Sequence, residues 1–198
     1  AMRRNGVRVC LEKAHSLDTS WKAIFKSDIE RIQSQIPFEV DIWASKSLER
    51  LCAHLKIAIN RTPKGNPSFE NEWFENHSHP VLQSIASARQ YDKMRRDFLK
   101  GQILEYEING RLHAQFHTTR RDEGGTRSGR YSSSNPNLQQ VPARHPIFGE
   151  AIRSLYLPDE GALWGKFDYS SQEPRITLHF ANIAGIISAA EFVERYHK

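Results

Sequence analysis

The sequence predicts an α+β fold, in which a helical first part is followed by a part with a small antiparallel sheet. Two observations support this prediction. Apolar residues recur at helical spacing through most of the first hundred residues. Asn109-Gly110, a dipeptide typical of tight hairpin turns, then lies between two alternating runs. We therefore expect one domain over residues 1–102 and a second over residues 103–198.

The first part should contain an amphipathic helix over residues 16–36, with Ser16 as its N-cap. A second helix is expected over residues 46–56, followed by a turn-rich tip over residues 60–68. The carboxylates of the segment Asp28 to Glu30 are expected on a solvated face of the first helix.

Ser68 is expected to cap a short helix, and Pro80 to open a long helix that ends near residue 100. The apolar stripe of this long helix is predicted to be Leu82, Ile85, Met94 and Phe98.

The second part should begin with the hairpin around Asn109-Gly110. A loop over residues 119–145 and a short helix over residues 147–155 follow. Residues 161–170, "GALWGKFDYS", read as a strand, and residues 171–184 return to a helical pattern.

Composition limits the function only loosely. The 198 residues carry 28 Lys+Arg against 23 Asp+Glu, a net charge of +5, which weakly favours an anionic partner such as nucleic acid. Cys10 and Cys52 fit a reducing compartment and form no zinc-type cluster. The sequence contains neither a membrane-length apolar run nor a signal peptide, so we expect a soluble, cytoplasmic protein.

Two stretches carry the functional signal. Residues 126–142, "TRSGRYSSSNPNLQQVP", combine hydroxyls, amides and arginines without helical or strand period, which suits either a solvated linker or a binding surface. In residues 164–180 a predicted strand leads into Asp168, and Glu173 follows in the first turn of a helix. A carboxylate held at the end of a strand suits Mg²⁺. Alternatively, Asp168 only ends the strand and Glu173 complements the helix dipole.

Together these stretches resemble the motifs of family A DNA polymerases, the group of bacterial DNA polymerase I and its phage relatives. The positions that match the family's motifs are Thr126, Gly129, Arg130, Ser132 to Ser134, Pro136 to Gln139 and Pro142, then Asp168, Tyr169, Ser170, Glu173 and Arg175. Departures at Tyr131, Gln140, Ser171, Gln172 and Pro174, and a longer loop over residues 120–125, indicate a divergent, phage-type member.

The resemblance implies a helical thumb over residues 1–102 and the first part of a palm over residues 103–198. Asp168 would be the first of two aspartates that bind a pair of Mg²⁺ ions, and the carbonyl of Tyr169 a further ligand. Glu173 would exclude ribonucleotides from the dNTP site, and Ser170 would contribute to the same nucleotide site.

The resemblance also implies contacts to primer-template DNA. Arg130 would reach the minor groove at the primer end. The loop residues that would line the duplex are Ser132, Ser133, Asn135, Asn137, Gln139 and Gln140. Lys93, Arg96 and Lys64 would hold the phosphate backbone. Each of these cations, and likewise Arg120, Arg121 and Arg127, could instead belong to a solvated surface.

The fingers and the second palm aspartate of the family have no counterpart in these residues. We therefore expect an incomplete portion of a polymerase, or one subunit of a split polymerase, that is inactive without a companion chain or downstream segment. The alternatives are a non-catalytic module that binds duplex DNA on a retained thumb and palm scaffold, and a protein–protein scaffold.

Overall fold

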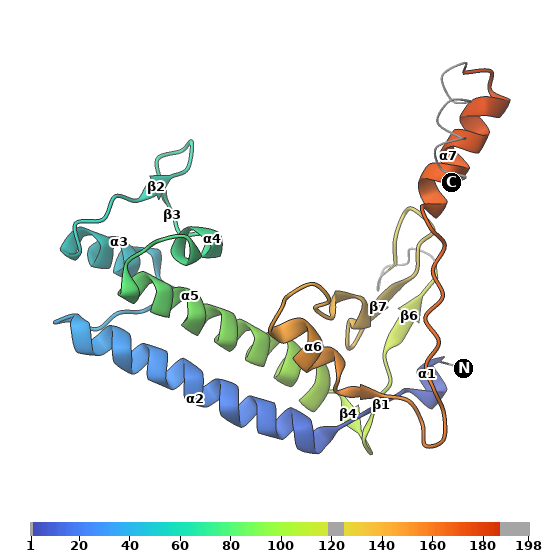
Figure 1. Ribbon diagram of the computed structural model, residues 1–198, viewed down its shortest axis with the longest axis horizontal. Coiled ribbons are helices and arrows are strands. Elements are labelled where there is room, and N and C mark those ends of the chain that lie inside the picture. The colour runs from blue at the N-terminus through green and yellow to red at the C-terminus, as the bar shows by residue number, and fades with distance from the viewer. Residues whose placement is uncertain (1, 119–124, 187–198) are drawn as a thin grey trace. The chain divides into compact units, whose positions relative to one another are not determined.

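The computed structural model describes residues 2–118 and 125–186. The chain divides into two compact units, residues 1–159 and residues 160–198, which are described separately below. The described part consists of helices and short antiparallel strands (Figure 1), which confirms the predicted α+β class. None of the described helices combines the length and the apolar character that crossing a membrane requires.

The first helices follow the predicted pattern with one correction. After α1 (Met2–Asn5) and β1 (Val7–Val9), helix α2 runs over Leu11–Gln35 and so begins upstream of Ser16. The N-cap position is Cys10, whose backbone N–H donates to the carbonyl of Leu155 at 2.8 Å. The prediction of Ser16 as N-cap was wrong, because strand β1 brings the chain into the helix earlier than the apolar period shows.

The turn-rich tip separates two further helices. Helix α3 (Ser45–His54) confirms the second predicted helix. The tip forms a small hairpin of β2 (Asn60–Arg61) and β3 (Pro67–Ser68). The short helix α4 (Asn71–Glu75) starts after Glu70, so the prediction that Ser68 caps it was wrong: Ser68 pairs with Asn60 in the hairpin.

The long helix opens at Pro80 as predicted, with the His79 ring nitrogen accepting from the Val81 N–H at 3.2 Å. It runs as α5 (Pro80–Lys93) and continues as the π-helix η1 (Met94–Leu104), in which each N–H bonds five residues back. Leu82 and Ile85 of the predicted stripe are fully buried, and Met94 and Phe98 are half-buried against the core. The prediction missed Leu99 and Ile103, which are the fully buried residues of η1.

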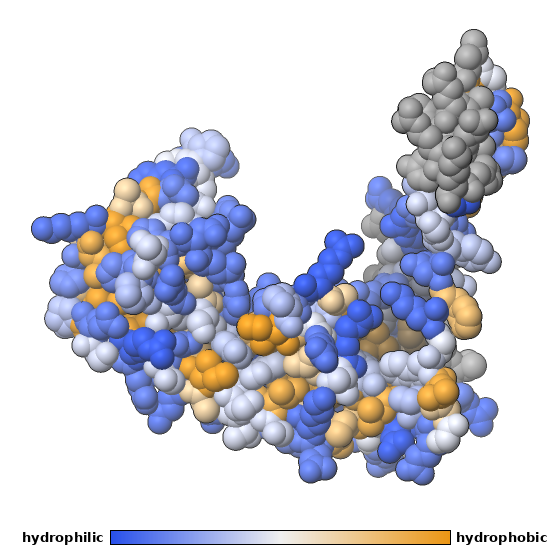
Figure 2. All heavy atoms as spheres, in the orientation of Figure 1, coloured by the Kyte–Doolittle hydropathy of each residue, from blue (hydrophilic) through white to orange (hydrophobic). Residues whose placement is uncertain are grey.

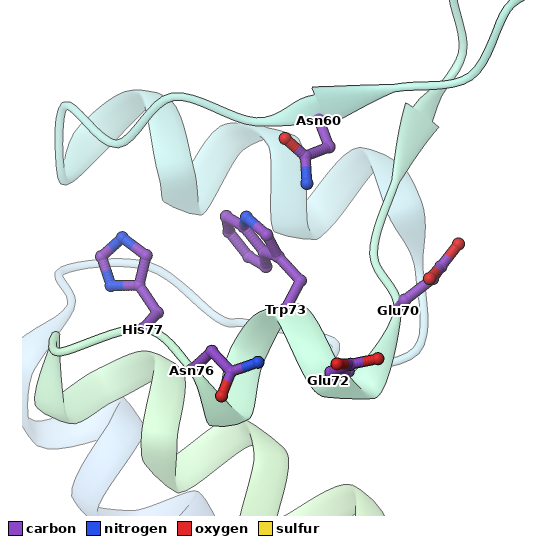
Figure 3. A pocket seen from close by; sticks show the side chains of 6 residues that line it. All are labelled: Asn60, Glu70, Glu72, Trp73, Asn76 and His77. Atoms are coloured by element: carbon purple, nitrogen blue, oxygen red, sulfur yellow. The ribbon is translucent and has the colours of Figure 1, made fainter.

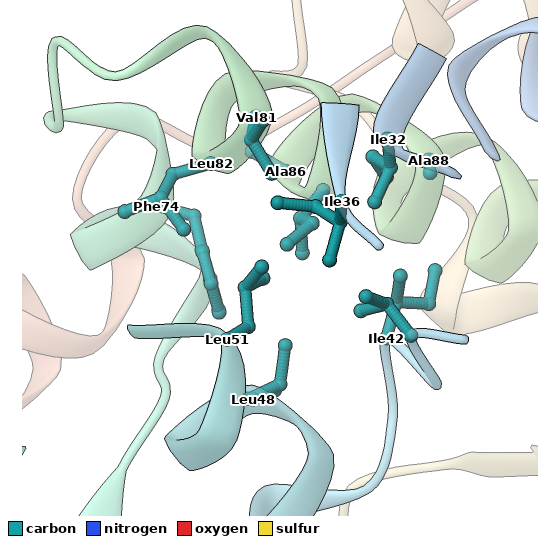
Figure 4. Close-up of a cluster of buried hydrophobic side chains, with 12 residues drawn as sticks. Ile32, Ile36, Ile42, Leu48, Leu51, Phe74, Val81, Leu82, Ala86 and Ala88 are labelled. Carbon is teal, nitrogen blue, oxygen red and sulfur yellow. The ribbon is translucent and has the colours of Figure 1, made fainter. Parts of the chain in front are cut away.

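Two hydrophobic clusters stabilise residues 1–159. Helices α2 and α5 lie side by side (Figure 1). The C-terminal end of α2 and the N-terminal half of α5 pack with α3 and α4. Figure 4 shows this first cluster, whose largest fully buried side chains are Ile32, Leu48, Leu51, Phe74, Leu82 and Ile85. The second cluster joins α2 and η1 to the sheet and to α6 (Phe148–Arg153), which lies within the predicted range of residues 147–155. Trp21 packs edge-on against Phe148 there, with ring centroids 5.1 Å apart.

One carboxylate on α2 departs from its predicted place. Asp28 is only 4% exposed, whereas Glu30 is exposed as predicted. One carboxylate oxygen of Asp28 accepts from the Ser87 hydroxyl on α5 at 2.6 Å, and the other pairs with Arg31 at 3.2 Å. Asp28 therefore ties α2 to α5.

The main sheet has four antiparallel strands in the order β4-β5-β1-β8. These are β4 (Glu107–Ile108), β5 (Arg111–Leu112), β1 and β8 (Tyr156–Leu157). Asn109 and Gly110 join β4 to β5 with φ angles of 51° and 77°, which confirms the predicted hairpin. Strand β1, from the predicted first domain, pairs between β5 and β8, so the sheet joins distant segments. The boundary near residue 102 stays a prediction.

Residues 160–186 consist of an irregular segment followed by one helix. Residues 162–169 have no regular secondary structure, so the strand predicted over residues 161–170 was wrong. A strand needs a hydrogen-bonded neighbour, and the described part of the chain provides none here. Helix α7 (Gln172–Ile183) then forms as predicted.

Candidate nucleic-acid interface

The segment predicted as a DNA-contacting loop is structured. Strands β6 (Gln115–His117) and β7 (Ser132–Ser134) pair in an antiparallel ribbon. His117 Nε2 lies 2.8 Å from the Ser134 hydroxyl across this ribbon. The short helix η2 (Leu138–Gln140) follows. The hydroxyls and amides are thus carried by an ordered turn.

Three of the predicted DNA contacts also shape this turn. Ser133 is only 5% exposed, and its hydroxyl donates to the Pro136 carbonyl at 3.2 Å. The Asn137 side-chain oxygen accepts from the Gln139 N–H at 3.1 Å and so caps η2. Gln139 in turn donates its side-chain amide to the Tyr131 carbonyl at 2.9 Å. These bonds fix the backbone on which the remaining polar groups are presented.

A cleft of about 660 Å³ lies between η1 and this turn. The predicted contact residues that line it are Lys93, Ser133, Asn135, Asn137 and Gln140. Gln102 and Tyr106, which the sequence did not single out, also line it, and the Tyr106 hydroxyl lies 3.3 Å from the Asn135 side-chain oxygen. The fold therefore brings a lysine of the long helix to the amides of the turn.

The other predicted DNA contacts are not part of the cleft lining. Arg96 is half exposed, pairs with Asp92 at 3.4 Å and lies over the Trp43 ring at 5.2 Å. Lys64 is exposed in the turn between β2 and β3. Arg130 is exposed and Ser132 is half-buried in the turn itself.

Two of the three loop arginines named as candidate phosphate contacts cannot be placed. Arg120 and Arg121 lie outside the described residues. Arg127 is exposed.

The predicted metal and nucleotide residues lie together on one short segment of the second unit. Asp168, Tyr169 and Ser170 are exposed, Tyr169 by 80%, and Glu173 lies in the first turn of α7. Ser171 precedes this helix in the left-handed conformation, with φ of 53°.

The donor groups on this segment fit part of a magnesium site. Mg²⁺ takes one or two carboxylates and completes its shell with water and phosphate oxygens, so Asp168 and the Tyr169 carbonyl suit one ion. Among residues 2–118 and 125–186, no group of three or more His, Cys, Asp or Glu residues is arranged to hold a metal. A pair of ions would need further ligands.

A second hollow, of about 380 Å³, lies near the tip of the helical part (Figure 3). Trp73 rises from α4 between Asn60 and His77, and the carboxylates of Glu70 and Glu72 flank it. Two carboxylates without a lysine or arginine repel a phosphate backbone, whereas the cleft beside η1 has one carboxylate, Asp97, together with Lys93. We therefore place the candidate interface at the cleft lined by Lys93.

The perturbed ionisable groups lie outside this cleft. Burial raises the pKa of the Cys52 thiol to about 11 and that of the Tyr156 hydroxyl to about 12. Burial lowers the pKa of Arg89, whose guanidinium donates to the carbonyls of Ile42 and Phe69. A hydrogen bond from Arg111 lowers the pKa of Asp159. These groups serve the packing of the fold.

The chain belongs to DNA polymerase family A, whose family model matches residues 12–197. It is 32% identical to a DNA-directed DNA polymerase of Pseudomonas phage M6, over 92% of this chain and 29% of that protein. It is 34% identical to the thermostable DNA polymerase I of Thermus aquaticus, over 94% of this chain and 22% of that protein.

The fold is similar to a solved structure, the POL domain of Pol1 from M. smegmatis in complex with DNA primer-template and dNTP. The TM-score is 0.71 at 25% identity, and the match covers 91% of this chain and 32% of that one. The chain thus spans about a third or less of the proteins it matches.

Proposed function

We propose that this chain forms the DNA-holding thumb and the first part of the palm of a DNA polymerase. The thumb would be residues 1–102 and the palm portion residues 103–198. The polymerase would catalyse template-directed DNA synthesis, transferring a nucleotide from a dNTP to the primer 3′-hydroxyl. Membership of DNA polymerase family A supports this proposal. The structural observation that carries it is the cleft that Lys93 lines together with Asn135, Asn137 and Gln140.

The cleft has the chemistry that a duplex needs. The Lys93 ammonium pairs with a backbone phosphate, and the amides hydrogen-bond to sugar and minor-groove atoms. Such contacts position DNA and carry little sequence information, as a polymerase requires. Arg130 contacts the minor groove at the primer end, where acceptors are nearly the same for every base pair. Arg96 and Lys64 extend the phosphate contacts along the helical part.

The chemistry is proposed for the segment around Asp168. The Asp168 carboxylate and the Tyr169 carbonyl would hold magnesium, with Glu173 and Ser170 on the side of the incoming nucleotide. A bound pair of ions supplies activation of the 3′-hydroxyl and stabilisation of the pyrophosphate oxygens. Glu173 occupies the space that a ribose 2′-hydroxyl would need and so favours dNTP.

We further propose that these residues act with a companion chain or a further segment that carries the fingers and the second palm carboxylate. Leu163 and Phe167 are 94% and 96% exposed next to Asp168, which supports a missing packing partner. Phage and bacterial relatives support a location in the cytoplasm of a bacterial or phage-infected cell.

The second candidate function is a non-catalytic module that binds duplex DNA. The observation that favours it is the small number of metal-binding groups beside Asp168, since the described residues contain no group of three or more His, Cys, Asp or Glu residues arranged to hold a metal. This module would use the same cleft and would need no companion.

Primer extension separates the two candidates. The 198-residue chain is expected to bind primer-template DNA, with an affinity that falls as salt rises, and not to extend the primer. Adding a family A fragment that contains fingers and a palm carboxylate should restore extension, and Asp168→Ala should abolish it again. Extension by the chain alone would disprove the incomplete-enzyme proposal, and failure to bind DNA would disprove both candidates.

A further inference from the structure

The long helix changes its hydrogen-bonding period where it reaches the cleft. It is α-helical to Lys93 and π-helical from Met94 to Leu104. The residues of this helix that line the cleft include Lys93, Asp97, Phe98 and Gln102. Lys93 and Gln102 are nine residues apart, which is two and a half turns of an α-helix and would put them on opposite faces. Bonds to the fifth residue back widen each turn, so that nine residues come close to two whole turns. The π-helical turn therefore places Gln102 on the same wall as Lys93.

The absence of a side chain at Gly101 leaves space for the π-helical hydrogen bonding of η1. A Cβ atom at Gly101 would lie 2.9 Å from the carbonyl oxygen of Arg96, five residues back. The obstructing atom belongs to the backbone, so it can yield only if the helix itself shifts. A glycine at this position therefore lets the π-helical turn close beside the cleft.

The side chain of Gln102 also has an unsatisfied hydrogen-bond acceptor. Its side-chain oxygen is buried and has no hydrogen-bond partner within the described part of the chain, although the residue lines the cleft. A buried polar atom without a partner is destabilising, and an unseen ligand or water is a common explanation. The matching surface across the cleft is the turn with Asn135 and Gln140.

We propose that Gln102 is a further DNA-contacting residue, whose side-chain amide hydrogen-bonds to the minor-groove edge of the duplex in the cleft. This inference rests on the proposed function. The minor groove offers acceptors at every base pair and a donor, the guanine amino group, at some. A glutamine amide both donates and accepts, and half a turn of its end group exchanges the two atoms. Gln102 therefore suits duplexes of any sequence.

The test is equilibrium binding of a labelled primer-template duplex to the 198-residue chain over a series of salt concentrations. Gln102→Ala is expected to weaken binding by about three- to tenfold, as the loss of one hydrogen bond does. The slope of log affinity against log salt should not change, because no charge is removed. Lys93→Ala should instead reduce that slope by about 0.9. Gln35→Ala is the matched control: it removes an exposed glutamine far along the chain and should bind as the unchanged protein does.

Gly101→Ala tests the role of the π-helical turn. It should weaken binding as Gln102→Ala does, and the double variant should be no weaker than either single variant, because both act through the same side chain. Circular dichroism and the melting temperature report whether each variant is folded. Should Gly101→Ala fail to fold, Gln102→Ala alone decides.

The inference is overturned when the unchanged chain binds DNA and Gln102→Ala binds equally well. It is also overturned when Gln102→Ala changes the salt slope as a lost cation would. Absence of DNA binding by the unchanged chain overturns the proposed function and this inference together.

Discussion

The two units of the chain differ in how far their large apolar side chains are buried. In residues 1–159, Phe74 and Phe148 are fully buried, and each belongs to a cluster built from several helices. In residues 160–186, Phe167 is 96% exposed and Phe180 on α7 is 63% exposed. Figure 2 shows hydrophilic side chains over most of the first unit's visible face, with smaller hydrophobic patches between them. The first unit contains the packing partners of its own rings, whereas Phe167 and Phe180 remain largely exposed.

This difference matters for function. The cleft that holds Lys93 and the turn amides stands on the packed unit, so its geometry is supported by the core. The segment for which we propose metal binding, around Asp168, has no strand beside it within the described part of the chain. We expect such a segment to gain order only when a partner covers it, at a cost of about 1–2 kcal/mol per residue in backbone entropy.

The largest expected difference between the two units is in the effect of replacing a phenylalanine on the free energy of unfolding. Phe74→Ala should lower the free energy of unfolding by about 3–5 kcal/mol, because it leaves a cavity in the first cluster. Phe167→Ala should change it by no more than about 0.5 kcal/mol, because that ring is 96% exposed. Denaturant unfolding of both variants measures this, and equal losses would show that the second unit has a core of its own.

A smaller effect is expected from the carboxylate that joins α2 to α5. Asp28→Ala should cost about 1–3 kcal/mol, because it leaves the Ser87 hydroxyl without its acceptor in a half-buried site. Glu30→Ala, on the exposed face of the same helix, should cost less than about 0.5 kcal/mol. Urea unfolding curves of the two variants compare them, and a loss as large at Glu30 would mean that charge on α2 matters more than burial.

The thiol of Cys52 should make the packed unit sensitive to alkali. Burial raises its pKa from 9.0 to about 11, so the folded protein keeps the thiol protonated where the unfolded chain ionises it. This contribution to stability is complete below pH 9.0 and is lost as the pH rises to about 11. Between pH 9.0 and about 11, the free energy of unfolding should therefore fall less with rising pH in Cys52→Ala than in the unchanged protein. Thermal melts at several pH values measure the slope, and identical slopes would contradict the expectation.

The smallest effects concern two glycines with positive φ. Gly110 has φ of 77° in the paired hairpin, so Gly110→Ala should cost about 1 kcal/mol of backbone strain. Gly161 has a similar φ of 74° in the second unit, where the chain can relax, and Gly161→Ala should leave the unfolding of the first unit unchanged. Chemical unfolding of the pair checks this, and an equal cost at Gly161 would indicate that its backbone is held as firmly as the hairpin.

Local signals were predicted well from the sequence. Pro80 begins its helix, Asn109 and Gly110 form the turn between β4 and β5, and the two polymerase motifs identify the family. Each depends on neighbouring residues only: on the fixed φ of proline, on the ease with which Asn and Gly adopt positive φ, or on an ungapped run of letters.

Predictions failed where a distant segment decides the outcome. Ser16 lies inside α2 because strand β1 pairs with β8, and Asp28 is buried because Ser87 meets it from α5. Gln102 escaped notice because an α-helical period was applied to a π-helical turn. Nine residues separate it from Lys93, which is two and a half turns of an α-helix but close to two of the wider turns of η1.

By itself, the sequence determined the α+β class and the family, and it supplied the residues for which we propose contacts to DNA and magnesium, because motifs and turns are short-range properties of the chain. Only the tertiary structure decided which of these residues meet: the cleft pairs Lys93 and Gln102 with the turn at Asn135. It also decided that the segment before Asp168 forms no strand in the described chain. The physical reason is the same in both cases, since a cleft wall and a strand each need a partner that lies far away in the sequence.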